Sequence, residues 1–309
     1  RCHRVTGVQT CALPIYKMVI GDTVVRKSYD KDITFKIIDI KEIDGKIVYI
    51  LKGISIRIIA DSPEDDLEHV DVNFIGEKEK ILNSRVNDAI KKAVNTRGYR
   101  HDISQFTRSS KSQKKAPNNE LIFGRPGKIL HIDGDKDYLE TCLKVYKQLS
   151  LDAVGRAISE KDQATKVVDL VKEVKPDIVV LTGHDSVLKT SDDYLDLNNY
   201  RNSKYYIDAV KALRNYNSSY DELVIFAGAC QSCYECLLDA GANFASSPSR
   251  VLIHCLDPVF VCEKIAYTNI DSVVSITNIV ENTITGIKGI GGLQTRGKYR
   301  EGYPKSPYI

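Results

Sequence analysis

Short apolar runs alternate with longer mixed stretches through the C-terminal half of the chain. The apolar runs are rich in β-branched residues and several are closed by Gly, a pattern typical of strands buried in a parallel sheet. We expect such strands at 128–133, 151–158, 177–183 and 222–229, with shorter strands at 242–245 and 251–254. We expect helices at about 136–149, 160–174 and 203–215, with a short helix after Gln231. This βαβα order predicts a doubly wound α/β fold with a mostly parallel sheet.

The N-terminal part of the chain has a different pattern, with closely spaced runs of Ile and Val. The dipeptide Asp44-Gly45 is a tight hairpin signal between two of these runs. Strands are expected at 22–26, 33–40, 46–51 and 55–60. So many short strands within residues 18–75 predict a small SH3-like β-barrel, to which we assign no chemistry because such barrels usually bind or scaffold.

Residues 76–127 separate these two patterns. Apolar positions at helical spacing predict a helix over 77–95, and the polar, basic stretch 108–119 predicts a linker. This linker is interpreted as a flexible connector or as a protease-sensitive segment open to self-cleavage. The α/β domain is then expected over 128–295, followed by a C-terminal tail at 296–309.

Residues 1–17 resemble translated sequencing-adapter read-through, and Met18, the single Met of the chain, is the expected natural start. The chain of 309 residues carries a formal net charge of +3, and the leader contributes Arg1, Arg4 and Lys17 without any acid. Residues 18–309 therefore carry a formal net charge of 0, which gives no indication of nucleic-acid binding. No apolar run is long enough to span a bilayer, and no secretory signal is recognised.

Six of the eight cysteines lie beyond the leader, and without an export signal they are expected to be reduced. The spacing Cys230-x2-Cys233-x2-Cys236 allows a metal or Fe–S interpretation. Because this run falls on an expected helix and no further Cys pair follows, packing of Cys233 and Cys236 within the helix is the favoured interpretation. No metal or cofactor is expected.

Two of the expected strands end in reactive residues. The run 177–183 leads into His184, and the run 222–229 leads into Cys230. If these strands are neighbours, the two side chains meet at the carboxyl edge of the sheet, where a thiol and an imidazole are the minimum for cysteine nucleophilic catalysis. Cys230 is expected at the start of a helix, where the helix dipole lowers a thiol's pKa. The alternatives are a buried structural Cys and a core His.

Asp133 and Asp135 end the first strand of the α/β domain, where paired acids bind Mg²⁺ in receiver domains. A receiver also needs a phosphoacceptor Asp after its third strand, and Thr182 stands there instead. The two acids are then interpreted as lining the cleft, where a carboxylate can hold a cationic substrate side chain. The Gly-rich stretch 286–292 lacks the context of a P-loop and is expected to be a flexible loop near the cleft.

The order strand-His, then strand-Ala-Cys resembles that of caspase-, gingipain- and clostripain-like cysteine peptidases, whose sheets are of the caspase or flavodoxin type. Their His is normally followed by Gly, where this chain has Asp185. From Met18 onward the chain more closely resembles the YabG family of sporulation-specific proteases of spore-forming Firmicutes. The matching stretches are 130–135 (LHIDGD), 182–186 (TGHDS), 200–203 (YRNS), 226–232 (FAGACQS), 240–248 (AGANFASSP) and 289–297 (GIGGLQTRG).

This resemblance implies a cysteine endopeptidase made late in sporulation in the mother-cell cytoplasm and associated with the forming spore coat. It would process spore-coat and germination precursors after Arg or Lys, process itself, and bind neither nucleic acid nor membrane. The family's catalytic pair falls on His184 and Cys230. The other candidate site residues are the backbone N–H of Cys230 and one near Gly183 for the oxyanion, and Asp133, Asp135, Asp185, Ser246 and Ser247 for substrate binding.

Two other functions stay open from the residues alone. One is a receiver-like binding or regulatory module without a phosphoacceptor, and the other is a structural spore-coat protein with inert cysteines. Fast alkylation of Cys230 relative to Cys142 or Cys262 would distinguish the enzyme from both. The sequence does not predict an oligomeric state or a third catalytic residue.

Overall fold

The computed structural model describes residues 18–71, 76–106, 122–188, 193–306 and 308. The expected leader 1–17 and the expected linker 108–119 lie outside these residues. The chain divides into two compact units. The first unit holds the chain up to Ile54 together with Ile59–Lys78, and the second holds Ser55–Ile58 together with Glu79–Ile309.

The first unit is an antiparallel sheet with the strand order β4-β3-β2-β1-β5. Its strands are β1 (Thr23–Arg26), β2 (Thr34–Ile43), β3 (Lys46–Gly53), β4 (Ile59–Pro63) and β5 (Leu67–His69). The hairpin predicted at Asp44-Gly45 is confirmed, and both residues have the positive φ that such a turn requires (52° and 73°). The likeness to SH3-like barrels stays a prediction.

The strand predicted at 55–60 is wrong for its first four residues. β4 begins only at Ile59, which pairs with Lys52 of β3. Ser55–Ile58 instead contributes its backbone and side chains to the second unit, where Ile56 forms an isolated antiparallel bridge with His254. The alternation of apolar and polar residues is the same for a strand and for this extended segment, so the sequence does not separate them.

The second unit is built on a sheet with the order β12-β11-β10-β9-β7-β8, in which every neighbouring pair is parallel except β11 and β12. Its strands are β7 (Ile129–Asp133), β8 (Ala153–Ala157), β9 (Ile178–Thr182), β10 (Val224–Ala227), β11 (Phe244–Ser246) and β12 (Ile290–Gly292). A separate antiparallel pair joins β6 (Phe123–Arg125) and β13 (Arg300–Gly302). The predicted α/β class with a mostly parallel sheet is confirmed.

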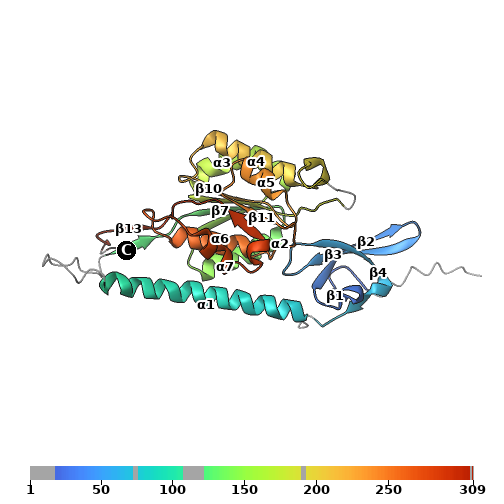
Figure 1. Ribbon diagram of the computed structural model, residues 1–309. Helices are drawn as coiled ribbons and strands as arrows, with labels where there is room; N and C mark the ends of the chain where they lie inside the picture. The colour runs from blue at the N-terminus through green and yellow to red at the C-terminus, as the bar shows by residue number, and fades with distance from the viewer. Residues whose placement is uncertain (1–17, 72–75, 107–121, 189–192, 307, 309) are drawn as a thin grey trace, which may run out of the picture. The chain divides into compact units, whose positions relative to one another are not determined.

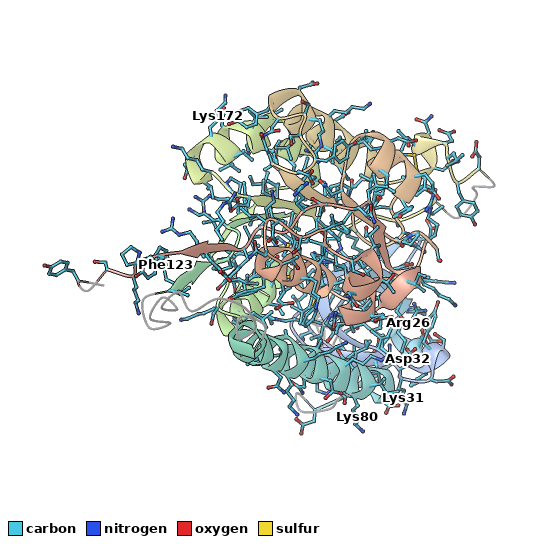
Figure 2. All side chains as sticks on the ribbon, turned by 60° about the vertical axis from the view of Figure 1, so that its left-hand side comes forward. Arg26, Lys31, Asp32, Lys80, Phe123 and Lys172 are labelled. Atoms are coloured by element: carbon cyan, nitrogen blue, oxygen red, sulfur yellow. A yellow bond between two sulfur atoms is a disulfide. The ribbon has the colours of Figure 1, made fainter. Side chains whose placement is uncertain are left out.

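Helices cover both faces of this sheet, as a doubly wound fold requires (Figure 1). The helices α3 (Glu160–Val174), α4 (Ser203–Tyr216) and α5 (Tyr234–Asp239) share one apolar core with one face. The helices α2 (Lys136–Gln148), α6 (Asp257–Tyr267) and α7 (Ile276–Asn282) share the other core, against which α1 (Glu77–Phe106) also packs. Polar residues lie on the outer helix surfaces; Lys172 on α3, for example, points away from the sheet (Figure 2).

Three further predictions differ from the structure. The helix predicted over 77–95 is wrong at its end, because α1 continues to Phe106. Residues 251–254 form no strand and only bridge to Ile56. The Gly-rich stretch is not a flexible loop, because Ile290–Gly292 forms the edge strand β12. Gly292 allows that pairing, since a Cβ there would collide with the carbonyl of Asn243 and the ring of Phe244.

No helix within the described ranges is both long enough and apolar enough to cross a membrane.

Candidate functional site

The strands that lead to His184 and Cys230 are neighbours in the sheet. β9 and β10 run parallel, with Leu181 opposite Ala227. His184 follows the last residue of β9 by two positions, and Cys230 follows the last residue of β10 by three. The carboxyl ends of parallel strands meet at one edge, so the topology brings both residues to the same rim of the sheet.

The turn that carries Cys230 depends on Gly228. Gly228 has a φ of 106°, and a Cβ at this position would lie 2.5 Å from Ser246 Oγ and 2.8 Å from Leu237 Cδ1. Only Gly meets both requirements without strain. The chain can therefore reverse directly after β10 and present Cys230 beside the neighbouring loops.

Ser246 and Ser247, expected to bind substrate, are both buried and hold this turn in place. Ser246 Oγ donates to the carbonyl of Ala229 at 2.7 Å. Ser247 Oγ donates to the carbonyl of Val251 at 2.6 Å and accepts the N–H of Gln231 at 3.0 Å. Both hydroxyls are thus engaged with the backbone around Cys230.

The Cys230 thiol is almost fully buried, at 1% exposure. Its Sγ accepts the N–H of Ile253 at 3.2 Å and lies 3.8 Å from the Ile253 carbonyl. Burial raises the pKa of this thiol to about 12, even though the hydrogen bond from Ile253 and the charge of Arg57 act in the opposite direction. The expected helix dipole is missing because α5 begins only at Tyr234, so the predicted lowering of the pKa is wrong.

The backbone N–H of Cys230 has no acceptor within the part of the chain that the structure describes. An amide N–H in this position is free to donate a hydrogen bond to an incoming group. The N–H of His184, beside the expected oxyanion donor Gly183, is less available, because it donates to Glu160 Oε1 at 2.7 Å. The role of Gly183 itself stays a prediction.

His184 is held on both its ring and its backbone. Its Nε2 lies 2.9 Å from Asp135 Oδ2. Its carbonyl accepts from Asn202 Nδ2 at 2.8 Å and from the Tyr206 hydroxyl at 3.1 Å. Because a carboxylate only accepts hydrogen bonds, we assign the proton to Nε2, which leaves the lone pair of Nδ1 free to act as a base.

Asp135 has a second role as the N-cap of α2. Its Oδ1 accepts the N–H groups of Asp137 at 3.0 Å and Tyr138 at 3.4 Å. The helix start thus fixes the carboxylate that in turn meets His184. Of the two expected cleft acids on this loop, Asp135 is therefore directed toward the imidazole.

Asp133, the other acid, is fully buried and forms a bidentate ion pair with Arg57. Arg57 Nη1 lies 3.0 Å from Asp133 Oδ1, and Nη2 lies 2.7 Å from Oδ2. Burial alone would raise the pKa of Asp133, but the charge of Arg57 and hydrogen bonds from His131 and Arg57 outweigh it and lower the pKa to about 2. The carboxylate is therefore ionised and matched to a guanidinium.

Arg57 was not recognised from the sequence as a site residue. Its guanidinium lies 4.8 Å from the centre of the Tyr138 ring, and Nη1 lies 3.5 Å from the carbonyl of Gly183, next to His184. Arg57 stands between Ile56 and Ile58, which is an ordinary strand pattern. Tyr138 and Glu160 were also missed, since each is unremarkable in the first turn of an expected helix.

Asp185 forms the centre of a buried hydrogen-bond cluster. Its Oδ1 accepts the N–H groups of Ser186 (2.9 Å) and Asn202 (2.7 Å), and its Oδ2 accepts the hydroxyls of Ser203 (2.5 Å) and Ser232 (2.8 Å). Burial raises its pKa, although these hydrogen bonds act in the opposite direction. Asp185 thus ties the loop after β9 to the start of α4 and to the turn after β10.

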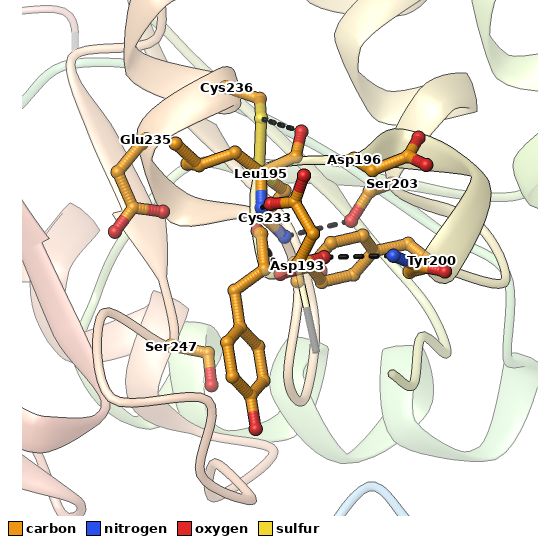
Figure 3. Close-up of a disulfide and its surroundings, with 12 residues drawn as sticks. Asp193, Leu195, Asp196, Tyr200, Ser203, Cys233, Glu235, Cys236 and Ser247 are labelled. Carbon is orange, nitrogen blue, oxygen red and sulfur yellow. Dashed lines mark hydrogen bonds between the residues drawn. A yellow bond between two sulfur atoms is a disulfide. The ribbon is translucent and has the colours of Figure 1, made fainter. Parts of the chain in front are cut away.

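Cys233 and Cys236 form a disulfide beside this cluster (Figure 3). The expectation that both thiols are reduced and pack within a helix is therefore wrong for this pair. Cys233 is the N-cap of α5 and Cys236 lies in its first turn, so their Cα atoms are 5.4 Å apart, within the range of a disulfide. Across the described ranges, no group of three or more His, Cys, Asp or Glu side chains is arranged to hold a metal ion.

A cavity of about 390 Å³ lies away from these residues, between α1 and the segment 280–286. Arg85, Asp88 and Lys92 provide its charged lining. None of the expected site residues lines it, so we place the candidate site at the carboxyl edge of β7, β9 and β10.

Comparisons with known proteins show the family to which the chain is similar. The family model described as YabG peptidase U57 matches residues 19–304. The sporulation-specific protease YabG of Bacillus subtilis (strain 168) is 41% identical over 288 residues, which cover 92% of this chain and 97% of that protein.

Proposed function

The chain belongs to the YabG peptidase family, and from this premise we propose that it is a cysteine endopeptidase that cleaves proteins after arginine or lysine. The observation that carries the proposal is the adjacency of β9 and β10, because it brings a thiol and a carboxylate-held imidazole to one edge of the sheet. A peptidase role follows from the family; the cysteine type and the specificity rest on this site.

In the proposed reaction, His184 Nδ1 takes the proton of the Cys230 thiol as Sγ attacks the scissile carbonyl carbon. The tetrahedral oxyanion accepts a hydrogen bond from the N–H of Cys230. The leaving amine takes the proton from His184, and a thioester with Cys230 remains. A water molecule, deprotonated by His184, then hydrolyses the thioester, which releases the new carboxyl end and restores the thiol.

Asp135 is proposed as the positioning residue for His184. A carboxylate on Nε2–H keeps the imidazole in one tautomer and stabilises the imidazolium that forms during proton transfer. The distance of 2.9 Å and the anchoring of Asp135 at the start of α2 support this role. Asp135 is thereby removed from the candidates for substrate recognition.

We propose that Asp133 is the carboxylate that binds the side chain of the substrate's arginine or lysine. It is ionised, lies at the carboxyl end of β7, and already holds a guanidinium in the bidentate geometry that a substrate arginine would use. Asp185 is fully occupied by hydrogen bonds within the chain, which argues against it as the specificity acid.

The biological substrates are proposed from the family alone. They are spore-coat and germination precursor proteins processed in the mother cell at the forming coat, and the chain would also process itself. The sporulation-specific character of the Bacillus subtilis relative supports the setting, and the candidate site supports the chemistry.

The test compares the full chain with Cys230→Ala and with Cys262→Ala, a matched control on α6 away from the candidate site. Each is incubated with an unfolded protein rich in Arg and Lys, and new termini are identified by mass spectrometry. We expect cleavage after Arg or Lys with wild type and Cys262→Ala only. Equal cleavage by Cys230→Ala would contradict the nucleophile. An absence of cleavage by every chain, including one in which Arg57 is replaced by Ala, would contradict the proposed peptidase activity.

A further inference from the structure

The segment Ser55–Ile58 lies along the candidate site as an added strand would. The carbonyl of Ser55 accepts the N–H of Cys255 at 3.1 Å, and Ile56 forms an antiparallel bridge with His254. The carbonyl of Ile56 accepts the Tyr138 hydroxyl at 2.8 Å. Its partners His254 and Cys255 follow directly after Ile253, whose backbone contacts the Cys230 thiol. Ser55 and Ile56 thus pair beside the nucleophile as the part of a bound substrate before its basic residue would.

The side chain of Arg57 enters the same region that the proposed specificity acid occupies. Arg57 is among the largest fully buried side chains, its guanidinium pairs with Asp133 through both terminal nitrogens, and its face meets the Tyr138 ring. Its Nε has no hydrogen-bond partner in the described part of the chain. Replacing a buried ion pair by apolar residues often leaves stability unchanged, so stability alone does not explain an arginine held this way. Its bidentate pairing fits the occupant of an arginine pocket.

The backbone at Arg57 is arranged for binding rather than for cleavage. The N–H of Ile58 donates to the carbonyl of Ile56 at 2.8 Å, which closes a tight turn centred on Arg57. That N–H belongs to the bond that cleavage after Arg57 would break. The residues that flank the segment are also held in place, because Lys52 of β3 pairs with Ile59 of β4. A substrate needs an extended backbone through the scissile bond, and this segment turns there instead.

We propose that Ser55–Ile58 is a built-in inhibitory segment, in which Arg57 fills the pocket that takes the basic residue of a substrate. The proposal rests on the proposed peptidase function and adds its regulation. A substrate then binds only in the fraction of molecules in which the segment has left the site, which lowers its apparent affinity by that fraction.

The activity test uses the full chain, Arg57→Ala and the matched control Arg156→Ala, whose guanidinium pairs on the surface with Glu173. The probe is a short peptide amide with a fluorogenic group after Arg. We expect Arg57→Ala to raise kcat/KM at least about tenfold, mainly through a lower KM, and Arg156→Ala to leave it unchanged. An unchanged or higher KM in a folded Arg57→Ala chain would overturn the proposal.

A binding test separates this proposal from the peptidase function. In a Cys230→Ala background, agmatine, which carries a guanidinium, is added to chains with and without Arg57→Ala, and the melting temperature is followed. Agmatine should raise the melting temperature only where Arg57 is absent, whether or not the chain is a peptidase. If Arg57→Ala fails to fold, Arg57→Met, which keeps the aliphatic stem, replaces it. Equal stabilisation of both chains, or of neither, would overturn the proposal.

A third test uses mass spectrometry of the purified full chain to determine whether it is cleaved after Arg57. We expect the Arg57–Ile58 bond to remain intact during incubations in which a protein substrate is consumed. A new N-terminus at Ile58 would overturn the inhibitory role, because the segment would then be a substrate of the site.

Discussion

At the scale of single residues, Asp133 and Asp135 show how two acids on one short loop take different partners. Asp133 ends β7 inside the unit and pairs with Arg57, whereas Asp135 caps α2 and meets His184. Their spacing in the sequence suited either role equally well. What separates them is the direction of each side chain relative to the sheet edge, which the ends of β7 and α2 determine.

Replacing Asp135 by Asn should lower kcat roughly 10²–10⁴-fold with little change in KM, because the carboxamide cannot stabilise the imidazolium of His184. The kinetics and the pH dependence of kcat would be measured beside Asp137→Asn, a matched control at an exposed position in the first turn of α2. A change in KM alone would show that Asp135 contacts substrate rather than His184.

The rate of alkylation of Cys230 in the wild-type chain should rise with pH without reaching a plateau below about pH 10, since burial raises the pKa of this thiol to about 12. Each pH unit should raise the thiolate fraction, and with it the rate, about tenfold. Iodoacetamide labelling followed by peptide mass spectrometry measures it. A plateau near pH 8 would mean that the thiolate is already formed in the resting chain.

At the scale of elements, the candidate site is assembled by loops that follow strands and by the helix starts that meet them. Asp185 illustrates this, because its four hydrogen bonds join the loop after β9, the start of α4 and the turn after β10. The disulfide between Cys233 and Cys236 adds a covalent link at the start of α5 (Figure 3). These links fix where His184 and Cys230 stand on the sheet edge.

Asp185→Asn should lower the free energy of unfolding by about 2–4 kcal/mol, because a carboxamide cannot accept all four hydrogen bonds and buried donors are left unsatisfied. The preference for cleavage after Arg should stay the same in the fraction that remains folded. Urea denaturation measures the free energy of unfolding, and a comparison of substrates measures the preference for cleavage after Arg. Asp208→Asn, exposed on α4, serves as control. A loss of the preference for Arg without a loss of stability would indicate that Asp185 recognises the basic residue of the substrate.

At the scale of the whole molecule, the Asp133–Arg57 ion pair joins residues that are far apart in the chain and makes folding sensitive to acid. The pKa of Asp133 is lowered to about 2 in the folded chain, below its ordinary value of 3.8. A carboxyl with a lowered pKa stabilises the folded state above its unfolded pKa, and this contribution is lost as pH falls through the folded pKa. The loss therefore falls between about pH 4 and pH 2.

The difference in unfolding free energy between wild type and Asp133→Asn should shrink by about 1 kcal/mol when the pH is lowered from 5 to 3. Comparing the two chains removes the contributions of other acids, such as Asp185 and Asp257, whose pKa values burial raises. Urea denaturation at both pH values gives the measurement. A difference that stays constant would show that Asp133 does not ionise with the lowered pKa.

Most of the α/β unit was predictable from the sequence because its elements are encoded locally. β-branched runs closed by Gly predict β9 and β10, and amphipathic spacing predicts α2, α3 and α4 within a residue or two. The same patterns could not locate the end of α1, the edge strand β12 or the true start of β4. Those boundaries depend on packing against distant segments, which local patterns do not contain.

By itself, the sequence determined the class of the fold, the two strand ends that carry His184 and Cys230, and the family to which the chain is similar. The tertiary structure alone decided which acid faces which partner, that Arg57 pairs with Asp133, that the thiol is buried, and that Cys233 and Cys236 are joined. The physical reason is the range of the interactions. Strands and helices follow from neighbouring residues, whereas burial, ionisation and ion pairing depend on residues that only folding brings together.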